Sequence, residues 1–213
     1  GAGRDSKVSG LAEDVAPVGA EKAGGGDIPA WTGCLPAVPS SVSYTPGEKL
    51  PNPFASDSVK FTITGANMAQ YDQYLTDGYR SLLSTYPSYK MDIYPTRRSC
   101  TFPDNVYAAT RANAGTGILV GGGNGVGKAI MGFPFPIPNN ALEIIWNHTL
   151  RFRSFKLTRQ FTAAAVTRSG DYTLQTVQDE AILRWSDPSK ASAEDLDNIS
   201  IYYIANTVAP ARS

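Results

Sequence analysis

Residues 132–153, GFPFPIPNNALEIIWNHTLRFR, contain the features from which the organisation of the chain is best inferred. Prolines alternate up to Pro138, and each fixes its own φ and pushes the residue before it towards extended geometry. Asn139 or Asn140 can then cap a short helix with the sequence ALEIIWNH. From Thr149 the apolar residues recur at every second position, which indicates a strand. The stretch therefore predicts a rigid extended segment, then a helix, then a strand.

Large apolar side chains in this stretch and further upstream are candidate core anchors. On the predicted helix, Leu142, Ile145 and Trp146 share one face by their i, i+3, i+4 spacing. In the Pro/Gly-rich N-terminal loop only Ile28 and Trp31 are large enough to bury much apolar surface. Ordering each loop residue costs about 1–2 kcal/mol of backbone freedom, so a few large side chains must hold such loops. We expect Trp31 and Trp146 to be core anchors.

The composition of the 213-residue chain limits the classes of protein to which it can belong. Its 19 basic and 19 acidic residues balance, so no global field attracts nucleic acid, and we expect no nucleic-acid partner. No apolar run approaches the roughly 20 residues that a membrane-spanning helix needs, and no signal peptide is expected within the chain. The length suits one domain, which we place at residues 17–213 after a flexible N-terminal segment at 1–16.

Periodicity along the rest of the chain predicts an α+β fold with short helices and long Pro/Gly-rich loops. Asn67 followed by Gln70 matches a capping box at a helix start. The last third is rich in β-branched and aromatic residues, and residues 168–171 suit a hairpin turn, so we expect an antiparallel meander. Helices are expected at 68–74, 76–86 and 105–114, and strands at 58–64, 150–157, 161–167, 172–185 and 199–208.

The glycine-rich stretch GGNGVGKA at 122–129 almost matches the phosphate-binding loop G-x-x-x-x-G-K-[ST]. In that motif Lys128 would contact phosphates, but Ala129 occupies the place of the Mg²⁺-binding hydroxyl. No amphipathic helix is expected next, because Gly132 and Pro134 intervene. We therefore expect a glycine loop that binds no nucleotide, and no cofactor.

The single histidine, His148, offers little for catalysis or metal binding. No H-x-x-x-H or C-x-x-C spacing supplies further metal ligands, and no G-x-S-x-G elbow supplies a nucleophile. A structural histidine that hydrogen-bonds neighbouring loops is the favoured interpretation. The sequence therefore predicts no metal site and no catalytic residues.

The two cysteines, Cys34 and Cys100, leave two interpretations open. They are either two unrelated buried thiols or one disulfide, which requires an oxidising compartment. A disulfide would close a loop of about 67 residues, worth roughly 4 kcal/mol on the chain-entropy model. Both cysteines lie in polar, turn-rich surroundings, unlike typical core positions, and the spacing alone favours the disulfide only slightly.

Four stretches together carry a resemblance to a known family. They are GAEKAGGGDIPAWTG at 19–33, ITGANMAQYDQYLTDGYRSLLSTYP at 63–87, MDIYPTRRS at 91–99 followed by FPDNVY, and GFPFPIPNNALEIIWNH at 132–148. This pattern resembles an uncharacterised family of secreted proteobacterial proteins, often described as outer-membrane lipoprotein-sorting-like and associated with the LolA/LolB-like superfamily. The resemblance extends from about Val15 to Arg212.

The resemblance implies a fold, a location and partners. The implied fold is a strongly curved antiparallel sheet, a half-barrel, wrapped around helices with an apolar cavity. Members are exported to the periplasm, are roughly twice this length, and are commonly encoded beside resistance-nodulation-division-type lipid exporters and outer-membrane barrel proteins. This chain therefore resembles the N-terminal half of a member. Expected partners are a lipid or other hydrophobic ligand, such an exporter and barrel protein, and the C-terminal half or a second copy.

The sequence departs from the family pattern at Cys34, where glycine is usual, and at Cys100, where a small residue is usual. The two departures together favour a Cys34–Cys100 disulfide. The family has no established catalytic residues, so the resemblance supplies none for this chain.

Three functions follow as hypotheses. The favoured one is a periplasmic carrier or docking module for a lipid, whose burial contributes about 0.8 kcal/mol per CH₂. A hydrolase on an apolar substrate is the first alternative, and it requires a polar constellation of Glu143, Asn147 and His148. A scaffold between an inner-membrane exporter and an outer-membrane barrel is the second. A modest cationic set could contact lipid headgroups or simply be solvated. The candidate ligand-binding residues are Trp31, Arg97, Trp146, His148 and Arg151.

Overall fold

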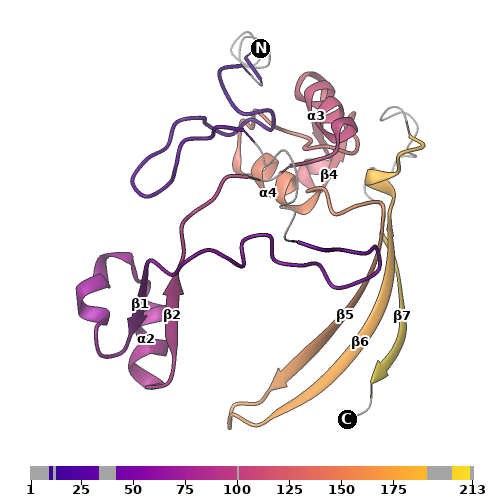
Figure 1. The fold of residues 1–213 in the computed structure, drawn as a ribbon. Helices are drawn as coiled ribbons and strands as arrows, with labels where there is room; N and C mark the ends of the chain where they lie inside the picture. Colours follow the sequence, from indigo (N-terminus) through magenta and orange to yellow (C-terminus); the bar gives the residue numbers. More distant parts are fainter. Residues whose placement is uncertain (1–9, 12, 34–41, 100, 191–202, 212–213) are drawn as a thin grey trace. The chain divides into compact units, whose positions relative to one another are not determined.

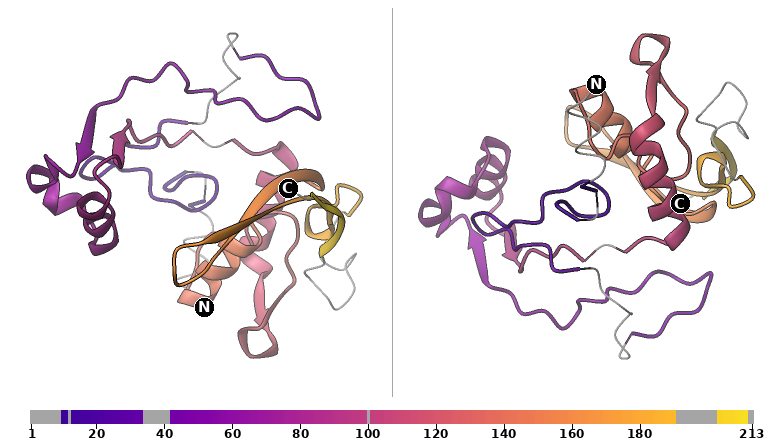
Figure 2. Two further views of the ribbon diagram at one scale, coloured as in Figure 1. Left: turned by 90° about the horizontal axis from the view of Figure 1, so that it is seen from below. Right: turned by 90° about the horizontal axis from the view of Figure 1, so that it is seen from above.

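The computed structural model, drawn in Figure 1, describes residues 10, 11, 13–33, 42–99, 101–190 and 203–211. Its fold is α+β, as the sequence predicts, with short helices and antiparallel sheets. The chain divides into two compact units, each of which can be followed by its colour in Figure 2. Unit 1 comprises residues 1–22 and 100–213, and unit 2 comprises residues 23–99. The single domain expected at 17–213 stays a prediction.

Unit 2 contains a two-stranded antiparallel sheet with two helices between its strands. Strand β1 (Phe61–Thr64) pairs with β2 (Lys90–Ile93). Between them the chain forms the 3-10 helix η1 (Met68–Tyr74) and the helix α2 (Asp77–Thr85). The buried core of this unit consists of Ile63, Leu75 and Leu83. The strand expected at 58–64 and the helices expected at 68–74 and 76–86 are therefore present, with β1 shorter than expected.

Side-chain hydrogen bonds explain where the helices of unit 2 begin. The hydroxyl of Thr76 accepts the backbone N–H of Tyr79 at 3.4 Å, which caps α2 at the expected position. The capping box expected at Asn67 is wrong. The Oδ1 atom of Asn67 accepts the N–H of Thr64 at 2.7 Å, and its Nδ2 donates to the carbonyl of Thr62 at 2.9 Å. The side chain thus supplies hydrogen-bond partners to the backbone N–H and carbonyl groups at the end of β1. Backbone groups of a strand that lack a partner in the sheet need another one, just as those at a helix end do.

Unit 1 begins with packed N-terminal residues. Leu11 and Ala16, which belong to the segment expected to be flexible, are buried. The guanidinium of Arg111 donates to the carbonyl of Leu11 at 2.9 Å. Arg111 lies on α3 (Asp104–Thr116), the longest helix among the described residues. The described part of the N-terminal segment is therefore held on unit 1 by both packing and a hydrogen bond.

Two further elements of unit 1 follow α3 directly. Strand β3 (Ile118–Val120) and β4 (Gly125–Gly127) form an antiparallel hairpin around the single 3-10 turn η2 (Gly121–Gly123). Helix α4 (Ala141–Thr149) begins after the Pro-rich segment, where the side chain of Asn140 accepts the N–H of its third residue, Glu143. The helix predicted by the proline and asparagine pattern is therefore confirmed.

The last part of unit 1 is a three-stranded antiparallel meander. Its order is β5 (Lys156–Val166), β6 (Tyr172–Leu183) and β7 (Tyr203–Ala211), with a 3-10 turn η3 (Arg184–Ser186) after β6. The hairpin turn expected at 168–171 connects β5 to β6. A strand starting at 150 is wrong, since β5 starts at Lys156. In Figure 1 the three strands bend along their length, but three strands do not establish the half-barrel, which stays a proposal.

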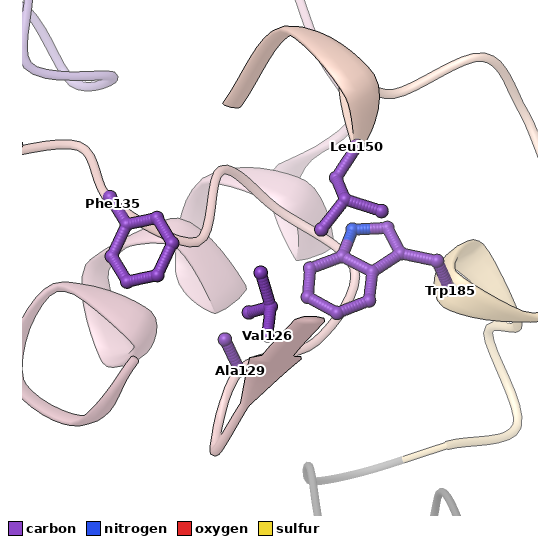
Figure 3. Packing of buried hydrophobic residues seen from close by; sticks show 5 residues of the cluster. All are labelled: Val126, Ala129, Phe135, Leu150 and Trp185. Carbon is purple, nitrogen blue, oxygen red and sulfur yellow. The ribbon is translucent and has the colours of Figure 1, made fainter. Parts of the chain in front are cut away.

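The main core of unit 1 forms where its short elements meet. Val126, Ala129, Phe135, Leu150 and Trp185 pack together and are nearly inaccessible to solvent. Figure 3 shows Val126 between the ring of Phe135 and the indole of Trp185. The indole N–H of Trp185 also donates to the carbonyl of Gly132 at 3.2 Å. Trp185 is the deeply buried tryptophan of the described residues, with 4% of its surface exposed, and sequence analysis did not identify it as an anchor.

Two asparagines support the irregular backbone that crosses this core. The amide of Asn147 accepts the N–H of Phe135 at 2.9 Å and donates to its carbonyl at 2.7 Å, as a neighbouring strand would. Asn113 does the same for Ile130, at 3.0 and 2.9 Å, and also donates to Phe133 at 3.2 Å. Because buried backbone groups need partners, these side chains let a Pro-rich segment lie inside the fold without a sheet.

Candidate functional site

Helix α4 carries the first candidate site, and its inner face is unexpectedly polar. Glu143 is buried, and its carboxylate accepts the backbone N–H of Asn139 at 2.8 Å. Asn147, one turn later, holds the backbone of Phe135. Leu150, just after the helix, completes this face and joins the core. The inner face therefore serves mainly to satisfy the backbone of the segment before the helix.

The outer face of α4 is formed by Leu142, Ile144 and Ile145, which are 46%, 56% and 58% exposed. The spacing on this helix predicts that Leu142 and Ile145 are buried with Trp146, and that prediction is wrong. The physical reason is the demand of the Pro-rich segment for hydrogen-bond partners, which turns Glu143 inwards and the aliphatic side chains outwards. Helix α4 thus turns polar side chains towards the core and aliphatic side chains towards solvent, which is the opposite of an ordinary surface helix.

Trp146 lies at the border between the two faces of α4. Its indole N–H donates to the carbonyl of Gly123 at 2.9 Å, and its ring packs against the main core while staying half-exposed. A Cβ at Gly123 would lie 2.7 Å from the Cδ1 atom of Leu142, and its φ of 96° also favours glycine. Trp146 is therefore a partial anchor that connects α4 to the glycine turn.

Strand β3, which leads into that glycine turn, adds exposed aliphatic surface. Ile118 and Val120 are both exposed, whereas Leu119 between them packs on the core. We refer to the exposed aliphatic residues of α4 and β3 together as the aliphatic surface, which comprises Ile118, Val120, Leu142, Ile144 and Ile145.

Two of the predicted ligand-binding residues follow at the end of α4. His148 is exposed in its last turn, and Arg151, also exposed, donates to the carbonyl of His148 at 2.9 Å. A cation at this end of a helix is favoured by the helix dipole. The structure thus brings Trp146, His148 and Arg151 together on one short segment of unit 1.

The other two predicted ligand-binding residues, Trp31 and Arg97, belong to unit 2. Arg97 lines a pocket of about 400 Å³, and so do Ala30 and Thr32, the neighbours of Trp31 in the chain. Trp31 is half-buried. Ile28, expected to anchor this loop, is 56% exposed, so that expectation is wrong.

The glycine-rich stretch 122–129 has the geometry of a hairpin tip. Gly121, Gly122 and Gly123 all have positive φ, and Lys128 follows the return strand with a φ of 55°. A phosphate-binding loop leads into a helix, whereas here the chain enters β4 at Gly125, one residue after the glycine turn. The backbone therefore lacks the helix start that the motif requires.

Other predictions of the sequence are tested only in part. Within the part of the chain that the structure describes, no group of three or more metal-ligating side chains comes together. None of the described helices is both long enough and apolar enough to span a membrane. Cys34 and Cys100 lie outside the described residues, so their disulfide stays a prediction. The residues just before them, Gly33 and Ser99, line the same pocket of unit 2.

Comparison with known proteins connects this geometry to a family. The model of a family described as "Protein of unknown function (DUF1329)" matches residues 62–213. The "Uncharacterized protein PA3922" of Pseudomonas aeruginosa is 40% identical over 209 residues, which are 95% of this chain and 44% of that protein. The chain thus spans less than half the length of this relative. No solved structure gives a significant match. By the extent of both matches, the chain belongs to the DUF1329 family of proteins of unknown function.

Proposed function

We propose that unit 1 binds a lipid or another hydrophobic molecule on its aliphatic surface, and that the protein is a carrier or docking module in the periplasm. The observation that supports this function is the reversed orientation of α4. Ile144 and Ile145 are each more than half-exposed and belong to none of the buried clusters of the described residues. Burying apolar surface against a ligand would contribute about 25 cal/mol per Å².

The end of α4 supports the same proposal. A lipid has a long apolar part and a polar headgroup, so its site needs an apolar surface beside a polar or cationic group. His148 and Arg151 are exposed just beyond the aliphatic residues of the helix. In the proposed complex these two side chains contact the headgroup, while Trp146 contacts the apolar part at the border of the surface.

The hydrolase alternative is less well supported by the same helix. It requires Glu143, Asn147 and His148 to converge on a substrate. The carboxylate of Glu143 and the amide of Asn147 are instead bonded to backbone groups on the inner face, and His148 is exposed. This division of the three side chains favours binding over catalysis.

A partner role remains part of the proposal because of the family resemblance. The proposed neighbours of the full-length protein are a lipid exporter and an outer-membrane barrel protein. The second half of the polypeptide, or a second copy of the chain, is proposed to cover the aliphatic surface. The aliphatic surface is suited to all of these occupants, but only a lipid would also use His148 and the guanidinium of Arg151 at the end of α4.

The test is lipid retention by the whole chain. Native mass spectrometry after incubation with short-chain phosphatidylglycerol should show bound lipid, and Ile145→Ser should reduce it by about fivefold or more, which corresponds to roughly 1 kcal/mol. Leu50→Ser is the matched control, because Leu50 is an exposed leucine of unit 2. Equal lipid retention by the chain and both variants would reject the proposal. Release of free fatty acid during the incubation would support the hydrolase instead.

A further inference from the structure

The segment from Arg151 to Lys156, which connects α4 to β5 in Figure 1, is rich in positive charge. Its sequence is RFRSFK, and no aspartate or glutamate lies anywhere between Glu143 and Asp171. The side chains of Arg151, Arg153 and Lys156 are all exposed. We refer to these three side chains as the cationic strip. The strip follows directly on the helix that carries most of the aliphatic surface.

The positive charges of the cationic strip are not neutralised within the part of the chain that the structure describes. None of the ion pairs found there involves any of its three members. The partner of Arg151 is the neutral carbonyl of His148, and the ammonium of Lys156 lies 5.6 Å from the centre of the neighbouring aromatic ring. Neither contact removes a charge. The next cation of the chain, Arg159, differs because it pairs with Asp179 at 2.8 Å.

Packing of the residue between the two arginines keeps them at the surface. Phe152 packs against the buried side chains of Val106 and Met131. Its neighbours on either side, Arg151 and Arg153, are left exposed. The two guanidinium groups therefore belong to a segment whose backbone is held by the core of unit 1, and not to a free loop.

The third cation is placed by the register of the β5–β6 hairpin. Lys156 is opposite Ile182, which is 38% exposed, whereas the adjacent Ala181 is buried. Successive side chains of a strand point to opposite faces, so Lys156 lies on the exposed face. Glu180 lies diagonally across from Lys156 in this register, but none of the ion pairs of the described residues joins the two. The two arginines are therefore the main part of the strip, and Lys156 is its edge.

The cationic strip begins where the aliphatic surface ends. Ile145 and His148 are three residues apart on α4, so their side chains are neighbours on the helix surface. The hydrogen bond to the carbonyl of His148 fixes Arg151 at this end of the helix. Two residues of chain span at most about 7 Å, which limits the distance from the backbone of Arg151 to that of Arg153. A single phospholipid can therefore contact both the isoleucine and the arginines.

We propose that the lipid bound on the aliphatic surface is an anionic one, whose negatively charged headgroup contacts the cationic strip. This inference rests on the proposed function, because the apolar part of the lipid must bind α4. It adds the class of headgroup. Guanidinium groups match the oxygens of a phosphate, and the net charge of phosphatidylglycerol is negative. Phosphatidylcholine carries a cation of its own, which the strip repels.

The first experiment is a calorimetric titration of the whole chain with short-chain phosphatidylglycerol and with phosphatidylcholine of the same acyl chains. Phosphatidylglycerol should bind at least about tenfold more tightly. Arg153→Gln should weaken its binding about fivefold, the contribution of one cation near an anionic lipid, and should leave phosphatidylcholine binding unchanged.

Arg168→Gln is the matched control for Arg153→Gln. Arg168 is also an exposed arginine of unit 1, in the turn between β5 and β6. The length of β5, roughly 35 Å at about 3.4 Å per residue, separates it from Lys156. Its substitution should leave the affinity for both lipids unaltered. Equal weakening of phosphatidylglycerol binding in the two variants would show attraction by overall charge and overturn the inference.

The dependence on salt is a second measurement that needs no variant. The Debye length falls from about 8 Å at roughly 0.15 M salt to about 3 Å at roughly 1 M. The preference for phosphatidylglycerol over phosphatidylcholine should therefore shrink severalfold over this range. A preference that does not change with salt would mean that charge is not its cause, and would overturn the inference.

Ile145→Ser separates the failure of this inference from the failure of the proposed function. If both lipids bind equally well and Ile145→Ser weakens both, the aliphatic surface binds lipid without selecting its charge, and only this inference is wrong. If neither lipid binds, or if Ile145→Ser has no effect on phosphatidylglycerol binding, the proposed function is rejected and this inference with it.

Discussion

The Pro-rich segment before α4 and strand β5 are opposites in regularity and in burial. The segment has no regular secondary structure, yet Pro134, Phe135 and Pro136 are buried. Strand β5 is regular over its whole length, yet none of its residues is buried. Regular hydrogen bonding is visible in a ribbon drawing, but the removal of side chains from water is not. The comparison teaches that the irregular segment is the better-protected part of unit 1.

The largest predicted effect concerns Phe135. Phe135→Ala should reduce the free energy of unfolding by about 3–5 kcal/mol, because the ring is fully buried in the cluster that contains Val126 and its removal leaves a cavity. Equilibrium urea denaturation of the whole chain measures this loss. A reduction below about 1 kcal/mol, the range of surface changes, would mean that the segment is not part of the core.

The next effect concerns the side chain that replaces a sheet for this segment. Asn147→Ala leaves the buried N–H and carbonyl of Phe135 without partners, so it should cost about 1–3 kcal/mol. The exposed Asn124, changed to alanine, is the control and should have little effect. If urea denaturation gives the same small change in the free energy of unfolding for both variants, water must replace the hydrogen bonds of Asn147 without loss of stability.

The same substitution in β5 should have a much smaller effect. Phe161 is 41% exposed, and its ring centre lies 5.1 Å from the guanidinium of Arg159. Phe161→Ala should therefore cost less than about 1 kcal/mol in the urea experiment used for Phe135. A loss as large as that of Phe135→Ala would show that β5 is covered in solution, by a second copy for example, and sedimentation would then reveal the dimer.

The smallest effect is the pH dependence of the β5–β6 hairpin. Hydrogen bonds from Arg159 lower the pKa of Asp179. A carboxyl whose pKa is lower in the folded state contributes stability above its unfolded pKa of about 3.9 and loses it as the pH falls through the folded value. The protection factors of the hairpin amides, measured by hydrogen exchange, should therefore fall below about pH 4, and Asp179→Asn should remove this dependence. A variant with the same pH profile would assign the effect to another carboxyl.

Local signals explain which parts of the fold the sequence predicts. Helix α4 and the β5–β6 turn are recovered because a capping asparagine and a glycine turn act on their immediate neighbours. The start of β5 is missed because residues 150–154 have strand-like side chains but pair with no strand among the described residues. Sheet pairing is a long-range property, and alternation alone cannot supply it.

The orientation of α4 shows why the candidate site could not be predicted fully. Trp146, His148 and Arg151 are found on one segment, as their closeness in sequence suggests. The direction of Ile145 depends on the backbone of Phe135, which needs Asn147 on the inner face. A prediction from residue spacing assumes that the apolar face of a helix packs on the core. In α4 the face that packs on the core is the polar one. The capping contact of Glu143 was the signal that could have indicated this.

The glycine turn η2 also has a consequence for chirality. Gly121 and Gly122 have φ values of 59° and 67°, on the side of the Ramachandran plot that L-residues rarely occupy. A Cβ added at either position would meet no atom within 4 Å, so the objection to other residues there is their handedness and not their size. A D-amino acid prefers this half of the Ramachandran plot. At these two positions, a D-alanine built by chemical synthesis would fit the turn better than any of the natural L-residues.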